Sequence, residues 1–136
     1  MRFGGRSTAR RRAPAALTPP PMQPLVTSAQ LDAVLRQPVA LVYKHSTRCP
    51  IAAMAHQEVE QLLRERPDAP VWIVDVTVQR ALSREVADRT GVEHESPQAI
   101  LLAAGEVVYE ASHFHVRADD LARELDAAEE EASGAT

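Results

Sequence analysis

Apolar residues divide the chain from position 27 onward into segments that alternate between helical and extended patterns. Nearly unbroken apolar runs, typical of buried strands, occur at residues 39–44, 71–76, 99–103 and 107–109. Apolar residues spaced by three or four positions predict helices over residues 28–35, 51–65, 81–90 and 118–130. Thr27 or Ser28 can cap the first of these helices, and Gly91 closes the third.

The order of these elements predicts an α/β fold. A helical crossover joins the first two strands, and this connection makes them parallel. The last two strands flank Ala104-Gly105-Glu106, which predicts a hairpin and therefore an antiparallel pair. The result is a four-stranded mixed sheet flanked by helices on both faces, which is the thioredoxin-like arrangement.

The composition fits one small domain with two tails. Residues 25–130 hold all the predicted elements, whereas the Pro/Arg-rich residues 1–24 and residues 131–136 are predicted to be disordered. Five of the 15 basic residues fall in the first 21 positions, which hold no acidic residue, so ten basic and 19 acidic residues remain. This acidic body argues against nucleic acid as the main partner, and no apolar run is long enough to span a membrane.

The basic segment at the start of the chain admits three interpretations. It is a disordered tail, it is an organelle transit peptide, or translation begins at Met22. It lacks the apolar stretch that a secretory signal requires.

The chain has a single cysteine, Cys49, at the junction between the first predicted strand and the helix that follows. An internal disulfide is therefore excluded, and the composition indicates a reducing compartment. A helix N-terminus carries partial positive charge, and Lys44 and Arg48 add full charges nearby. These charges favour the thiolate, which is the reactive form of a cysteine.

Three further segments are expected to meet Cys49 at one edge of the sheet. The carboxyl ends of parallel strands share an edge, which places Asp75, Thr77 and Gln79 beside the thiol. The antiparallel pair brings Ser96-Pro97-Gln98 and Ser112-His113-Phe114-His115 to the same edge. Ligands gather at this edge in open α/β sheets, so these residues are the candidate binding site.

Each of these residues also has a simpler interpretation. Pro97 is either a cis proline beside the thiol or an ordinary trans proline at the start of a strand. A His-x-His pair on a strand would point both rings to one face, so His113 and His115 either bind a metal with Cys49 or His94 or lie on the surface. His45 is a general base or a local charge, and Asp75 is a site residue or a helix cap.

The residues after the cysteine restrict the chemistry. Cys49-Pro50-Ile51-Ala52 resembles the Cys-Pro-Tyr-Cys motif of glutaredoxins, with Ala52 in place of the second cysteine. Such a chain can form a mixed disulfide and pass it to another thiol, but it cannot close its own disulfide. A cysteine phosphatase loop would need an arginine where Ala55 stands.

Three segments match the pattern of a known family. They are Lys44-His45-Ser46-Thr47-Arg48-Cys49-Pro50-Ile51, Gly91-Val92-Glu93-His94-Glu95-Ser96-Pro97-Gln98 and Ala111-Ser112-His113-Phe114. They resemble the monothiol bacilliredoxin (YtxJ-type) family, and the resemblance covers residues 27–127. The chain departs from its relatives at Ala52, where they often carry serine, and in its N-terminal extension.

The resemblance implies a cytoplasmic thioredoxin-fold enzyme that exchanges disulfides with bacillithiol, a cysteinyl-glucosaminyl-malate thiol, and with proteins that carry it. Bacillithiol would be a cosubstrate, with no tightly bound cofactor and no metal. The expected partners are S-thiolated proteins, without nucleic acid or membrane, and a monomer is expected.

Cys49 is the predicted catalytic residue, and Lys44, Arg48 and Pro50 are predicted to stabilise its thiolate. Ser96, Pro97, His113 and His115 are the predicted substrate-binding residues.

Two alternative functions stay open at this point. One is a non-catalytic binding module in which Cys49 is a passive core residue. The other is an iron–sulfur carrier like the monothiol glutaredoxins.

Overall fold

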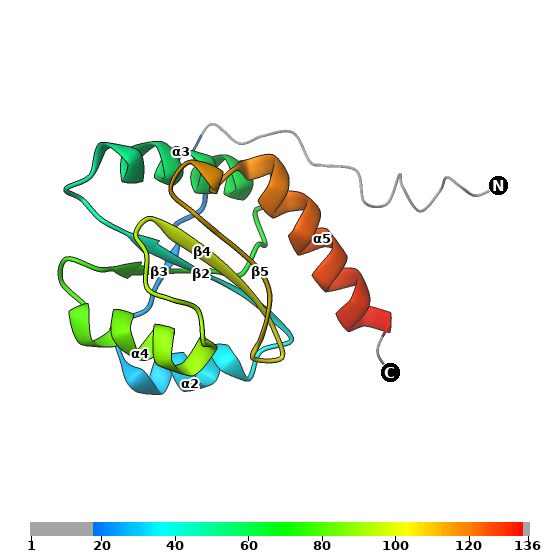
Figure 1. Cartoon of the computed structure of the whole chain (residues 1–136). Coiled ribbons are helices and arrows are strands. Elements are labelled where there is room, and N and C mark those ends of the chain that lie inside the picture. Colours follow the sequence, from blue (N-terminus) through cyan, green and yellow to red (C-terminus); the bar gives the residue numbers. More distant parts are fainter. Residues whose placement is uncertain (1–17, 135–136) are drawn as a thin grey trace.

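The computed structural model describes residues 18–134, which form a single sheet with helices on both faces (Figure 1). The strands are β1 (Gln23–Pro24), β2 (Val39–His45), β3 (Val71–Asp75), β4 (Gln98–Ala103) and β5 (Glu106–Ser112). The helices are α2 (Ser28–Leu35), α3 (Pro50–Glu65), α4 (Arg80–Thr90), the short 3-10 helix η1 (His113–His115) and α5 (Ala118–Gly134). None of the helices within this described part has the length and apolar character needed to cross a membrane.

The five strands lie in the order β1-β3-β2-β4-β5. β2 and β3 are parallel, whereas β4 runs antiparallel to both β2 and β5. Helices α3 and α5 cover one face of the sheet, and α2 and α4 cover the other (Figure 1). Alternate residues of β2 supply the two cores, with Leu41 and Tyr43 under α3 and α5, and Ala40 and Val42 under α2 and α4.

The predicted thioredoxin-like fold is confirmed, and most elements begin within a residue of their predicted positions. Thr27 caps α2 and forms a capping box with Gln30. Gly91 ends α4 with a φ of 76°, a conformation that suits glycine. Helix α5 continues to Gly134, four residues past its predicted end.

The predicted strand count is wrong, because a fifth strand lies within the segment expected to be a tail. In β1, Gln23 and Pro24 pair in parallel with Trp72 and Ile73 of β3. The next residue, Leu25, is fully buried and donates a backbone hydrogen bond to the carbonyl of Ile73, at 2.9 Å. A strand of two residues has no alternation to detect in a sequence. The rest of the predicted tail, residues 1–17, lies outside the described residues.

Candidate active site

Cys49 is the N-cap of α3, with an extended backbone (φ −116°, ψ 125°) and Pro50 as the first helical residue. Its carbonyl accepts hydrogen bonds from the backbone N–H groups of Ala52 and Ala53, at 3.0 and 3.3 Å. The Cys49 side chain is half-buried. The residue is thus partly exposed at the N-terminal end of a 16-residue helix, which is the positive end of the helix dipole.

Ala52 occupies the place of the second cysteine of a dithiol motif and is fully buried. Since Cys49 is the only cysteine of the chain, no second sulfur of this chain can resolve a disulfide formed there. The site is limited to exchange with thiols of other molecules.

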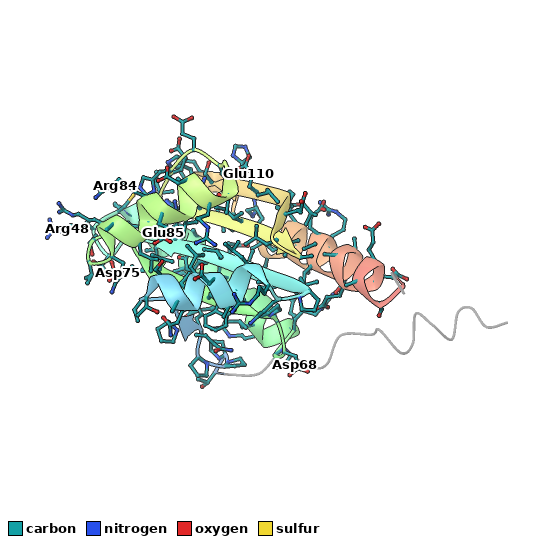
Figure 2. All side chains as sticks on the ribbon, turned by 90° about the horizontal axis from the view of Figure 1, so that it is seen from below. Arg48, Asp68, Asp75, Arg84, Glu85 and Glu110 are labelled. Carbon is teal, nitrogen blue, oxygen red and sulfur yellow. The ribbon has the colours of Figure 1, made fainter. Side chains whose placement is uncertain are left out.

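The two predicted thiolate-stabilising cations have different environments. Arg48 is exposed and extends outward at the same end of the molecule as Asp75 (Figure 2). Lys44 is fully buried, and its Nζ lies 2.9 Å from Nδ1 of His94. Burial lowers the pKa of Lys44 to about 8. The structure thus directs the Lys44 ammonium to the loop before β4, and its action on Cys49 stays a prediction.

The peptide bond between Ser96 and Pro97 is cis. Pro97 is buried, and its carbonyl accepts a hydrogen bond from the N–H of His113, at 2.9 Å. This bond fastens the loop before β4 to η1, which itself packs against α3. Within the described residues, neither the N–H nor the carbonyl of Ser96 takes part in a hydrogen bond. The main chain at Ser96 can therefore pair with a bound molecule.

His113 and His115 lie in η1, so the expectation that they share a strand face is wrong. The chain turns at His113, which has a φ of 56°, immediately after β5 ends at Ser112. The two rings are differently placed: His115 is exposed, whereas His113 is half-buried with Nε2 at 3.5 Å from a Glu95 carboxylate oxygen. Residues 18–134 contain no group of three His, Cys, Asp or Glu side chains suited to a metal ion.

A cavity of about 310 Å³ lies between α3 and η1. Its lining combines two exposed apolar residues, two buried apolar residues and four polar or charged ones: Met54, Phe114, Ala55, Val116, Gln57, Glu58, His113 and Arg117. One wall of the cavity belongs to the helix that Cys49 opens, although Cys49 is not among the lining residues.

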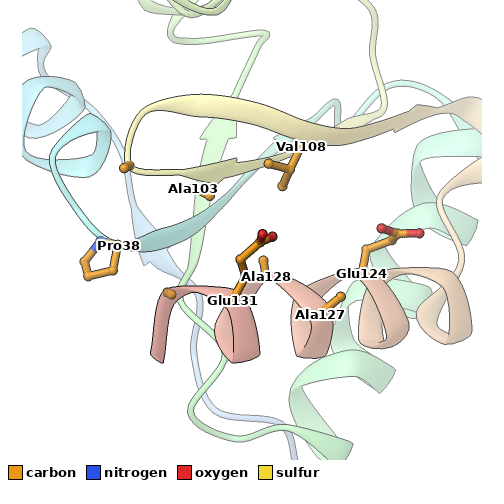
Figure 3. Close-up of a pocket in the computed structure, with 9 residues that line it drawn as sticks. Pro38, Ala103, Val108, Glu124, Ala127, Ala128 and Glu131 are labelled. Carbon is orange, nitrogen blue, oxygen red and sulfur yellow. The ribbon is translucent and has the colours of Figure 1, made fainter. Parts of the chain in front are cut away.

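A second hollow, of about 510 Å³, lies between the β4–β5 turn and the C-terminal half of α5 (Figure 3). Alanines, Pro38 and Val108 form most of its lining, and the carboxylates of Glu124 and Glu131 are its charged groups. It adjoins the start of β2, whereas Cys49 follows the end of that strand. The larger of these two hollows therefore does not mark the reactive site, which is identified by the position of Cys49.

The sequence interpretation missed a polar cluster between the end of β2 and α3. The hydroxyl of Tyr43 lies 2.9 Å from Nδ1 of His45 and 3.3 Å from Nδ1 of His56, on α3. Burial, followed by the nearby His56, lowers the pKa of His45, so this imidazole favours its neutral form. His56 stands four residues after the buried Ala52, and this helical spacing was the available signal that it borders the core.

Asp75 closes a turn after β3 rather than capping α4, whose N-cap is Gln79. Its carboxylate accepts hydrogen bonds from the hydroxyl and the N–H of Thr77, at 2.6 and 3.0 Å. The hydroxyl bond is the main reason why the pKa of Asp75 is lowered. This turn shapes the edge of the sheet where β2 and β3 end.

Comparison with known proteins identifies this arrangement. A family model described as monothiol bacilliredoxin BrxC matches residues 23–121. A solved structure titled "A putative oxidoreductase with a thioredoxin fold" is 34% identical, with a TM-score of 0.71, over 76% of this chain and 92% of that chain. A mutant thioredoxin from Halobacterium salinarum NRC-1 is 26% identical, with a TM-score of 0.63, over 82% and 94% of the two chains. Thioredoxin from Trypanosoma brucei brucei, at 12% identity, shares the fold, with a TM-score of 0.66 over 82% and 93%.

The family model covers the segments that build the site: the strand and helix around Cys49, the loop that contains Pro97, and η1. A thioredoxin fold with one half-buried cysteine at a helix N-terminus is the structure of a thiol oxidoreductase. The chain belongs to the monothiol bacilliredoxin family.

Proposed function

We propose that the protein removes bacillithiol from S-bacillithiolated proteins by monothiol exchange. The Cys49 thiolate attacks the bacillithiol sulfur of the protein mixed disulfide. A bond forms between the two sulfurs, the original disulfide breaks, and the repaired protein leaves as a thiolate that takes up a proton. A second bacillithiol thiolate then attacks the bacillithiol sulfur on Cys49, which yields bacillithiol disulfide and frees Cys49. The reducing cytoplasm is the compartment that suits this cycle.

One observation carries this proposal: a single, half-buried thiol at the start of α3, with the fully buried Ala52 where a resolving cysteine would stand. Such a site accepts a small thiol and must return it to a second one. The family match gives bacillithiol as the small thiol to test first.

The surroundings of Cys49 supply contacts for the two ends of such a substrate. The N–H and carbonyl of Ser96, which form no hydrogen bond within residues 18–134, can pair with the bound thiol in the manner of an added strand. Arg48 and His115 are exposed, and His113 borders the cavity beside α3, so these three can meet the malate carboxylates. The Glu95 carboxylate lies 3.5 Å from His113 and would repel a malate carboxylate at that ring. His115 and Arg48 are therefore the more favourable contacts for the malate group.

Intact-mass measurement after incubation with a small disulfide tests the proposal. We expect one bacillithiol adduct per chain from bacillithiol disulfide, formed faster than the adduct from glutathione disulfide. Cys49→Ser should form neither adduct. Equal rates with the two disulfides would remove bacillithiol specificity, and the absence of any adduct would leave Cys49 as a passive residue.

A further inference from the structure

Lys44 is a buried cation whose hydrogen bond goes to a neutral partner. The residue is fully buried on the face of β2 that packs against α2 and α4, and its Nζ contacts Nδ1 of His94 at 2.9 Å. A buried ammonium is costly unless it is paired, and the usual partner is a carboxylate. Here the partner is an imidazole on an exposed loop residue, which stabilises the charge less than an acid would. The position therefore calls for an explanation other than stability.

A second buried side chain holds the same loop. Gln98 lies directly opposite Lys44 in the β2–β4 pairing and is 1% exposed. Its Nε2 donates to the backbone carbonyl of Glu93, at 3.0 Å. Two neighbours across the sheet, Lys44 and Gln98, thus hold two neighbours along the loop, His94 and Glu93.

This loop leads directly to Ser96, at the edge of the sheet where β2 ends four residues before Cys49. Ser96 and the cis Pro97 follow His94 within three residues, and the Pro97 carbonyl is fixed by the N–H of His113. Ser96 therefore lies between two anchor points, one on the sheet and one on η1. Movement at either anchor would shift the N–H and carbonyl of Ser96 relative to Cys49.

We propose that Lys44 is a positioning residue for thiol exchange, which acts through His94 to hold the Ser96 main chain where an extended substrate segment can pair with it. The inference rests on the part of the proposed function in which the substrate pairs with Ser96. It does not depend on which small thiol the enzyme uses. It differs from thiolate stabilisation, because Lys44 then changes how substrates bind and leaves the sulfur itself unaffected.

The chemistry of the link sets its pH range. An imidazole that accepts a hydrogen bond at Nδ1 is neutral and carries its proton on Nε2. Burial, the Lys44 ammonium and Arg84 of α4 lower the pKa of His94, whereas Glu95 in the same loop opposes this shift. Protonation of His94 in acid would place two cations 2.9 Å apart and break the link. Above neutral pH the link persists, because an uncharged Lys44 amine still donates an N–H.

The test compares a probe that needs the loop with probes that do not. The first probe is an extended hexapeptide whose cysteine is disulfide-bonded to 2-mercaptoethanol, and the small probes are iodoacetamide and 2-hydroxyethyl disulfide. We expect Lys44→Met to slow exchange with the peptide roughly tenfold, as for loss of one charge-assisted hydrogen bond, and to leave both small probes within about twofold. Since no bacillithiol is present, failure here is distinct from failure of the proposed substrate. Equal slowing with all three probes would overturn the proposal in favour of an effect on the sulfur or on folding.

Variants of the partner keep the test independent of Lys44. His94→Gln retains an acceptor for the ammonium and should keep the peptide rate near that of the parent, whereas His94→Leu should slow it like Lys44→Met. Glu93→Gln changes an exposed side chain in the same loop and leaves both links intact, so it is the matched control. The ratio of peptide to iodoacetamide rates should fall in acid in the parent, at a pH below the ordinary pKa of histidine, and stay level in His94→Gln. If the ratio of peptide to iodoacetamide rates does not change with pH and is the same in His94→Gln and His94→Leu, the Lys44–His94 link has no part in positioning Ser96.

Discussion

At the scale of single residues, the positive charges near Cys49 divide between the surface and the interior. Arg48 and His115 are exposed, His113 is half-buried beside Glu95, and Lys44 lies inside the domain. The sequence interpretation grouped Lys44 with Arg48 because both lie within five residues of Cys49. Strand alternation separates them, since Tyr43 and His45 face α3 and Lys44 between them must face the other side. That part was predictable; the acceptor, His94, was not, because a loop conformation has no periodicity.

Lys44 should make the stability of the domain depend on alkaline pH. Burial lowers its pKa from 10.5 to about 8, so between these values the unfolded chain binds more protons than the folded one. Stability due to this group therefore rises from pH 8 to pH 10.5, and at pH 7 the buried charge costs on the order of 1–3 kcal/mol. We expect Lys44→Met to be more stable than the parent at pH 7, with a difference that shrinks toward pH 10.

Urea unfolding followed by circular dichroism at pH 7, 8, 9 and 10 would measure this difference. An advantage of the Met variant that stays constant with pH would contradict the assignment. A variant that gains stability and loses peptide exchange would show a residue kept for function at the expense of stability.

At the scale of elements, local signals in the sequence located most of the structure. The cap at Thr27 and the glycine that ends α4 are chemical markers, and each located a boundary. Pro50, the first residue of α3, was not used as a marker, and the predicted helix began one residue later. The two elements that were missed, β1 and η1, have two and three residues, too few for any periodic pattern. Their positions depend on partners distant in sequence: Ile73 for β1, and Pro97 for η1.

The short strand β1 should matter more for stability than its length indicates. A chain that begins at Met22 keeps β1 and the fully buried Leu25, so its Tm should stay within about 3 °C of the parent. A chain that begins at Val26 loses both. Removal of one buried leucine costs about 2–5 kcal/mol, which lowers the Tm by roughly 10 °C or more. Scanning calorimetry of the two chains separates these outcomes, and equal Tm values would show that β1 contributes nothing.

At the scale of the whole molecule, the topology brings four segments far apart in sequence to one edge of the sheet, where β2, β3 and β5 end and β4 begins. The element order predicted this convergence, because parallel strands end at one edge and an antiparallel hairpin returns to it. The cis Ser96–Pro97 bond, the hydrogen bond from His113 to Pro97 and the packing of η1 on α3 are consistent with it. The Tyr43, His45 and His56 cluster was not foreseen, since it joins a strand and a helix across the core.

Under the proposed function, substrate discrimination depends on this edge of the sheet and should respond to changes in η1. His113→Ala combined with His115→Ala should slow the reaction of Cys49 with a bacillithiol mixed disulfide roughly tenfold, the effect of one charge-assisted hydrogen bond of about 1.5 kcal/mol. Reaction with neutral 2-hydroxyethyl disulfide should be nearly unchanged. Arg123→Ala removes an exposed cation from α5 (66% exposed) and serves as the control for net charge. If the double variant keeps the parent rate with both disulfides, the histidines are not part of the binding site.

The buried Ala52, in place of a second cysteine, limits the number of transfers that each protein molecule can perform. When no free thiol is supplied, each molecule can perform a single transfer, because the chain holds no second thiol to resolve the mixed disulfide on Cys49. A stopped-flow trace under these conditions should rise to a plateau without a steady phase, and the height of the plateau equals the concentration of reactive Cys49. The single-transfer reaction therefore measures the concentration of active sites directly. In a cell depleted of the small thiol, its repair capacity would be set by copy number and no longer by turnover rate.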